Sequence, residues 1–353
     1  MNHVFKIALL CLCAVSLVRA QDLKTENVIL ITLDGLRWQE VFSGADSRLV
    51  WRAGESAQKF SSDSPVDRRR LLMPFFWNTV VNEGVLLGNR SAGNRVNVTN
   101  RRVFSYPGYN EILTGFADHS IDSNDKIPNR NVTVLEWVNQ QPGFVGRVAA
   151  FTSWDVFPFI INEERSGVPV NSGFEVASGQ ITDREAFLNR LQVEVATPWV
   201  WERFDVFTHY MAMEYLARER PRFLYIAFGD TDEFAHKDDY GAYLKAIRQT
   251  DDFIRDLWTW LQEDEDYAGK TSLVITTDHG RGYADRWIGH GSGWVGSSSI
   301  WMAILGPDTP ARGEIKDPGQ LFQNQIAATV AALLSLDYKN VREIGAPVDA
   351  AIR

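Results

Sequence analysis

Continuous runs of apolar residues, rather than alternating ones, mark the strands expected along this chain. Residues 27–33 read NVILITL, residues 222–228 read RFLYIAF, and residues 271–277 read TSLVITT. Strands with apolar side chains on both faces are typical of a parallel sheet that is covered by helices on both sides. Two shorter runs, 147–151 and 299–305, are expected to add strands to the same sheet.

Between these runs, apolar residues recur at the spacing of three to four residues that is typical of helices. The segments expected to be helical are 71–83, 132–141, 184–218 with a break at Pro198, 240–263 and 320–334. Strands that alternate with helices predict an α/β fold with a mostly parallel central sheet and helices on both faces. Two stretches, about 37–70 and 153–201, mix aromatic, charged and turn-forming residues, and we expect them to be insertions that cap one end of the sheet.

The N-terminus has the pattern of an export signal. Lys6 precedes an apolar run over residues 7–18, and Ala20 supplies the small residue that a signal peptidase needs. This run is too short to span a bilayer, and no other segment is long and apolar enough to do so. We therefore predict a signal peptide over residues 1–20, a single domain over residues 21–353, and export to the periplasm or the medium.

Composition and charge narrow the class of protein. With 45% hydrophobic and 12% aromatic residues, the chain is too apolar for a disordered protein. The excess of 45 acidic over 36 basic residues gives a net charge of −9, which argues against a nucleic-acid-binding surface. Both cysteines, Cys11 and Cys13, fall in the expected signal peptide, so the mature chain is expected to contain no disulfide.

Three of the expected strands end next to a carboxylate. Asp34 follows the first run, Asp232 lies just beyond the second, and Asp278 follows the third. A single aspartate in such a place is usually a helix cap or a turn residue. Because ligands bind at the carboxyl edge of open α/β sheets, three carboxylates at this edge indicate a functional site.

Histidines accompany two of these carboxylates. Asp232 and His236 are four residues apart, which places them on the same face of a helix. His279 follows Asp278 directly, and His290 is flanked by glycines that permit a close approach of the backbone. Mixed carboxylate and imidazole ligands suit Zn²⁺, and Mn²⁺ to a lesser degree. Six such ligands are too many for one tetrahedral zinc, so the pattern predicts two divalent metal ions.

Ser105 is the candidate nucleophile. It precedes Pro107 and a short apolar helix, so its hydroxyl is expected at a helix N-terminus. There the free N–H groups and the helix dipole favour a developing alkoxide and a bound phosphate. Coordination to a metal would also lower the pKa of the hydroxyl without an adjacent general base. The alternative is that Ser105 only caps the helix.

The order of these motifs resembles the alkaline phosphatase superfamily, most closely its nucleotide pyrophosphatase/phosphodiesterase and cofactor-independent phosphoglycerate mutase branches. The resemblance is carried by Leu33-Asp34-Gly35, Ser105-Tyr-Pro and Thr114-Gly115, Asp232-x-x-x-His236, Asp278-His279-Gly280 and His290-Gly291. By position, it implies that Asp232, His236 and His290 hold one metal and that Asp34, Asp278, His279 and the Ser105 hydroxyl hold the other. It also implies an oxyanion-binding asparagine, for which Asn124 is the candidate and Asn110 a weaker one.

The resemblance implies an exported, metal-dependent hydrolase of small-molecule phosphate esters, either a phosphomonoesterase or a phosphodiesterase. Ser105 would attack phosphorus, and a phosphoseryl intermediate would then be hydrolysed. The chain reads Ser105-Tyr-Pro-Gly-Tyr109 where the phosphodiesterase branch usually has Thr-Phe-Pro-Asn-His and where sulfatases place an arginine at the fifth position. A sulfatase or a phosphotransferase on the same fold remains an alternative. A non-catalytic oxyanion-binding protein is a further one, although such a protein needs no nucleophile.

Overall fold

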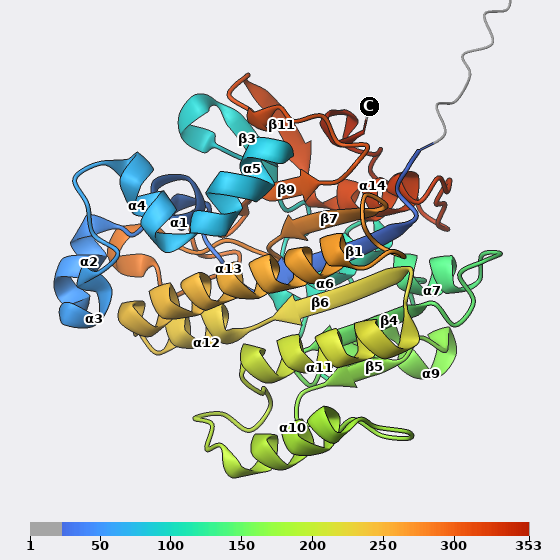
Figure 1. The fold of residues 1–353 in the computed structure, drawn as a ribbon. Helices are drawn as coiled ribbons and strands as arrows, with labels where there is room; N and C mark the ends of the chain where they lie inside the picture. The colour runs from blue at the N-terminus through green and yellow to red at the C-terminus, as the bar shows by residue number, and fades with distance from the viewer. Residues whose placement is uncertain (1–22, 353) are drawn as a thin grey trace, which may run out of the picture.

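A computed structural model describes residues 23–352, so the expected signal peptide and both cysteines lie outside the described residues. Its centre is an eight-stranded sheet with the strand order β10-β2-β9-β7-β1-β6-β4-β5 (Figure 1). These strands are β1 (Asn27–Leu33), β2 (Val85–Leu87), β4 (Val148–Thr152), β5 (Val170–Ser172), β6 (Phe223–Phe228), β7 (Thr271–Thr276), β9 (Met302–Leu305) and β10 (Gly313–Glu314).

Five neighbouring strands, β7, β1, β6, β4 and β5, are parallel to one another. Strand β9 runs antiparallel to both β7 and β2. A smaller sheet, in the order β11-β3-β8, contains β3 (Asn94–Asn97), β8 (Ser299–Ile300) and β11 (Gly319–Phe322). The prediction of a mostly parallel central sheet is confirmed.

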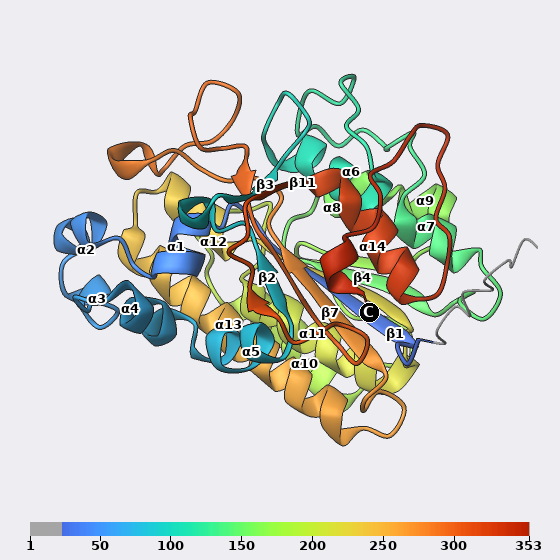
Figure 2. The same ribbon diagram turned by 90° about the horizontal axis from the view of Figure 1, so that it is seen from above.

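Helices cover both faces of the large sheet (Figures 1 and 2). Alternate side chains of β1 show why: Ile29 and Ile31 join the apolar core on one face, and Val28 and Leu30 join the core on the other. The first core contains residues of α11 (Asp205–Glu219) and α13 (Tyr240–Glu263), and the second contains residues of α6, α7 and α14. The other helices are α1 (Trp38–Ser43), α2 (Ser47–Ala53), α3 (Glu55–Gln58), α4 (Pro65–Leu72), α5 (Val81–Glu83), α6 (Ser105–Thr114), α7 (Val134–Asn139), α8 (Phe157–Ile161), α9 (Glu163–Ser166), α10 (Asp183–Glu194), α12 (Asp230–His236) and α14 (Ile326–Leu333).

Several element boundaries differ from the sequence-based expectation. The run 299–305 forms two strands, β8 and β9, which belong to different sheets. The segment 320–334 begins as strand β11, because its backbone pairs with β3, and becomes α-helical only at Ile326. The segment 71–83 is expected to be one helix, but helix α4 ends inside it, before Met73. The extended φ of Met73, −132°, is typical of a residue that precedes proline.

The two stretches expected to be insertions differ in what they add. Figure 1 shows α1 to α4, from residues 37–70, at the edge of the sheet where β1 and β6 end. The second stretch, 153–201, contains α8, α9 and α10, and it adds β5 to the central sheet alongside β4. Within residues 23–352, no helix is long and apolar enough to cross a membrane.

The buried His209 on α11 should make the fold sensitive to acid. Its ring stacks on Phe253 at 4.4 Å, and burial lowers its pKa from 6.5 to about 4. Unfolding restores the higher pKa, so stability is complete above pH 6.5 and falls as the pH drops toward the folded value. Between about pH 7 and 4, the free energy of unfolding of the native chain should fall by about 3 kcal/mol because of His209. We expect this part of the pH dependence to be absent in His209→Phe. Denaturant unfolding at several pH values measures this loss, and the exposed His119→Phe serves as the control. An unchanged pH slope in His209→Phe would contradict the assignment.

Candidate active site

The ends of three adjacent parallel strands bring the predicted carboxylates together. Asp34 follows β1, Asp278 lies just beyond β7, and α12 with Asp232 begins just after β6. Since β1 lies between β7 and β6, all three carboxylates meet at one edge of the sheet. Asp278 Oδ1 accepts the N–H of Gly35 at 3.0 Å. Gly35 has φ of +60°, and a β-carbon there would lie 2.8 Å from Asp232 Oδ1, so this tight turn requires glycine.

A first cluster surrounds the Nε2 atom of His279. This atom lies 3.3 Å from Asp34 Oδ1, 3.4 Å from Asp278 Oδ2 and 3.4 Å from the Ser105 hydroxyl oxygen. Both His279 and Asp278 are fully buried. The structure therefore brings together the four side chains that the family resemblance assigns to one metal.

A second cluster lies directly beside the first. His236 Nε2 is 3.0 Å from Asp232 Oδ2 and 3.0 Å from His290 Nε2. His290 Nε2 is 3.8 Å from Asp232 Oδ1, and its ring stacks on that of His279 at 3.9 Å. The side chain of His236 is 47% exposed, so this cluster faces solvent.

The electrostatics of the two clusters fit divalent cations. Asp34 Oδ1 and Asp278 Oδ2 are among the described buried atoms that have no hydrogen-bond partner. Burial and the charge of Asp232 raise the pKa of Asp34, and burial and Asp34 raise the pKa of Asp278. Burial and His279 hold the pKa of His290 well below its usual range, so its ring is neutral and can act as a ligand. Crowded, unsatisfied carboxylates beside imidazoles form a ligand set that a divalent cation would neutralise.

The sequence-based prediction missed Arg281, which follows Asp278 by three residues. Its buried guanidinium pairs with the Asp232 carboxylate and also donates to the Asp232 carbonyl oxygen at 3.1 Å. Burial opposes ionisation of Asp232, but Arg281 and His236 outweigh it and hold the pKa of this carboxyl well below its usual range. Arg281 therefore keeps Asp232 charged and oriented.

The backbone that leads into Ser105 is held in an uncommon conformation. Val103 has φ of +56°, a rare value for a β-branched residue, and its N–H donates to Asn100 Oδ1 at 2.8 Å. The buried carboxylate of Glu111 accepts the N–H of Asn100 at 2.8 Å and its side-chain amide at 2.9 Å. Sequence reasoning missed Glu111 and Asn100, which together fix the loop that positions Ser105 at the start of α6.

Asn124 lies at the N-terminus of α6, as expected for a residue that assists Ser105. Its side-chain oxygen accepts the N–H of Tyr106 at 3.0 Å. Since that oxygen is used in this way, the amide nitrogen is the atom that could donate to a phosphoryl oxygen. This geometry is compatible with the predicted role of Asn124.

Asn110, the weaker candidate, has a different environment. It is fully buried, and its side-chain oxygen accepts from the amides of Asn129 and Asn131, each at 3.1 Å. Its own amide donates to the carbonyl of Phe116 at 3.2 Å. Through these contacts, Asn110 joins α6 to the following loop, which is a structural role.

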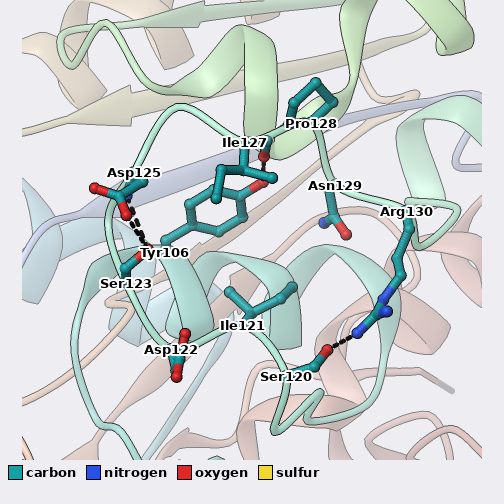
Figure 3. A pocket seen from close by; sticks show the side chains of 10 residues that line it. All are labelled: Tyr106, Ser120, Ile121, Asp122, Ser123, Asp125, Ile127, Pro128, Asn129 and Arg130. Atoms are coloured by element: carbon teal, nitrogen blue, oxygen red, sulfur yellow. Dashed lines mark hydrogen bonds between the residues drawn. The ribbon is translucent and has the colours of Figure 1, made fainter.

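A pocket of about 250 Å³ lies next to α6 (Figure 3). The ring of Tyr106 and residues of the 120–130 loop line this pocket, and the Tyr106 hydroxyl donates to the carbonyl of Ile127 at 2.6 Å. The seven predicted metal ligands are not among its lining residues. Ser105 therefore contacts the first cluster, whereas its neighbour Tyr106 lines this pocket.

Comparison with known families agrees with this geometry. The model of the type I phosphodiesterase/nucleotide pyrophosphatase family matches residues 62–331. The chain belongs to this family. It is accordingly an alkaline phosphatase superfamily hydrolase, as the order of its motifs predicted. No curated protein matches the sequence.

Several solved structures of other enzymes share this fold. A mutant of alkaline phosphatase PafA superimposes with a TM-score of 0.60 at 11% identity, over 94% of this chain and 99% of the other. Phosphonate monoester hydrolase of Agrobacterium radiobacter gives 0.57 at 14% identity, over 92% and 76%. Lipoteichoic acid synthase LtaP from Listeria monocytogenes gives 0.53 at 13% identity, over 89% and 73%. At these identities the likeness establishes the fold alone.

The second cluster should bind a metal ion of its own, separate from the ion of the first cluster. We expect His290→Ala to lose about one equivalent of zinc per chain, because it removes an imidazole ligand and leaves two ligands at most on that side. Elemental analysis of zinc-saturated, dialysed protein measures this loss, with the exposed His119→Ala as the matched control. Equal zinc content in the two variants would contradict the assignment of ligands.

Proposed function

We propose that this enzyme is an exported, metal-dependent phosphodiesterase in which Ser105 is the nucleophile. The observation that carries the proposal is the position of the Ser105 hydroxyl, 3.4 Å from His279 Nε2 and within a cluster of buried carboxylates. The family description supports a phosphodiester as the substrate class. The signal-like sequence of residues 1–20 supports export.

Asp34, Asp278 and His279 would hold one divalent ion and Asp232, His236 and His290 the other, with Zn²⁺ favoured by the mixed ligands. When bound, such ions lower the pKa of a nearby hydroxyl and stabilise negative charge on phosphoryl oxygens. The Ser105 oxygen then forms a bond to phosphorus as the bond to the leaving alkoxide breaks. Water later cleaves the phosphoseryl bond, which releases the phosphoryl product and restores the serine.

Neutral groups of the chain assist this reaction. The Asn124 amide would donate to a non-bridging oxygen of the phosphate. The N-terminus of α6 presents backbone N–H groups and a positive dipole to the charge that develops beside Ser105. Both groups stabilise negative charge without requiring a proton to move.

Tyr109 argues against sulfate as the substrate. It occupies the position at which sulfatases carry an arginine, and its hydroxyl donates to Asp34 Oδ2 at 2.9 Å. The residue therefore orients a predicted metal ligand and lies fully buried. We expect turnover of aryl phosphodiesters and no turnover of aryl sulfates.

Removal of the nucleophile gives the direct test. Ser105→Ala should lower kcat for an aryl phosphodiester by about 1,000-fold or more, because it removes the attacking oxygen. Zinc content and the unfolding midpoint should stay near those of the native enzyme. The control is Ser123→Ala, which removes a hydroxyl from the loop beside α6. Near-native activity of Ser105→Ala would contradict the proposed mechanism.

Phosphomonoester and sulfate substrates, assayed in parallel, establish the ester class. A higher kcat/KM for aryl phosphomonoesters than for diesters would overturn the diesterase proposal while leaving the role of Ser105 intact.

A further inference from the structure

Three buried carboxylates gather at the end of β6, outside the predicted ligand set. Glu202 precedes α11, Asp205 is the first residue of α11, and Asp230 is the first residue of α12. They are 5%, 2% and 4% exposed, and one oxygen of each lies within 4.8 Å of the others. The guanidinium of nearby Arg203 donates hydrogen bonds to Thr208 and Asn171, and its charge favours ionisation of Asp205.

Backbone and hydroxyl donors hold two of these carboxylates in place. Asp205 Oδ1 accepts the Ser153 hydroxyl at 2.6 Å and the Gly229 N–H at 2.7 Å, and its Oδ2 accepts the Asp230 N–H at 3.1 Å. Asp230 Oδ1 in turn accepts the Asp205 N–H at 3.3 Å. The starts of α11 and α12 are therefore fixed to each other, and their carboxylates form a preorganised pair.

The third carboxylate lacks such partners. Glu202 Oε1 is buried and is among the described atoms that have no hydrogen-bond partner. The group packs over the α-carbon of Gly229, where any β-carbon would collide with it. Glycine at this position makes room for a third carboxyl group beside two others. Burial and the neighbouring carboxylates raise the pKa of Glu202 well above its usual range, so ionising all three groups is costly unless a cation balances them.

We propose that Glu202, Asp205 and Asp230 bind a hard divalent cation, Mg²⁺ or Ca²⁺, at a site separate from the two histidine-containing clusters. The donors are all oxygen atoms, which these two ions prefer, whereas the catalytic clusters include imidazoles. Metal–oxygen distances of about 2.1 to 2.5 Å place opposite ligands roughly 4 to 5 Å apart. One oxygen of each carboxylate lies within 4.8 Å of the others, which is close enough for a single ion to contact all three.

The site would act on the catalytic centre through α12. Asp230 begins the helix that carries Asp232 and His236, and the intervening Thr231 hydroxyl donates to the Asp34 carbonyl at 2.5 Å. A cation bound here ties the start of α12 to the 202–205 segment. Asp230 is thus a positioning residue for the second cluster, and this inference goes beyond the proposed reaction.

Thermal unfolding of the zinc-loaded enzyme, freed of excess metal, tests the site. Titration with CaCl₂ and, separately, with MgCl₂ should raise the melting temperature in a saturable way, and the ion with the lower half-saturation is the one the site prefers. Glu202→Gln should raise that half-saturation by about tenfold or more, because it removes one charged ligand. The control Glu164→Gln, which removes a charge from an exposed position on α9 outside the cluster, should titrate like the native enzyme.

The neutral variant Glu202→Gln also distinguishes a cation site from a purely structural cluster. In chelator, Glu202→Gln should unfold at the same temperature as the native chain or higher, since it removes like-charge crowding. Asp230→Asn provides the same test if Glu202→Gln does not fold, and equilibrium dialysis of the native enzyme with ⁴⁵Ca²⁺ counts the bound ion directly. No shift in the native enzyme with either ion, or an equal shift in the native enzyme and Glu202→Gln, would overturn the proposal.

Discussion

The site depends on one electrostatic constraint, the burial of like-charged carboxylates at the ends of adjacent parallel strands. Asp34, Asp232 and Asp278 meet because β7, β1 and β6 are neighbours and end at the same edge. In water-free surroundings such a group of charges is unfavourable unless cations or donors balance it. Arg281 balances Asp232, and Tyr109 donates to Asp34. The remaining unsatisfied oxygens, Asp34 Oδ1 and Asp278 Oδ2, are the atoms that the proposed metal ions would neutralise.

Ser105, the proposed nucleophile, is positioned by a different part of the structure. Helix α6 belongs to the core on the other face of the sheet from α13, and the Glu111 carboxylate secures the loop that enters it. The Ser105 hydroxyl can therefore meet the proposed metal ligands, which lie on other segments of the chain. The strained backbone at Val103 lies where this precise placement is needed.

Local patterns predicted the parts of the structure that depend on local sequence. The apolar runs predicted β1 with its observed bounds, and helical periodicity predicted α13 over Tyr240–Glu263. The candidate ligands could also be chosen, because strand ends in a parallel sheet converge. Their convergence is seen in the structure, whereas metal binding by them stays a prediction.

Features that arise from distant pairing could not be predicted in this way. Strand β11 resembles the start of a helix in sequence and becomes a strand through its pairing with β3. Arg281 and Glu111 resemble ordinary charged residues, and only the folded chain shows that each is buried against a partner. Glu202 joins its cluster from a loop with no motif of its own.

The central claim is that these strand ends form a two-metal centre. The most direct measurement is an anomalous difference map from crystals of the enzyme grown with zinc. The account predicts two strong peaks, one among Asp34, Asp278 and His279 and the other among Asp232, His236 and His290. A map with no peak at these residues, or with zinc only elsewhere on the molecule, would contradict it.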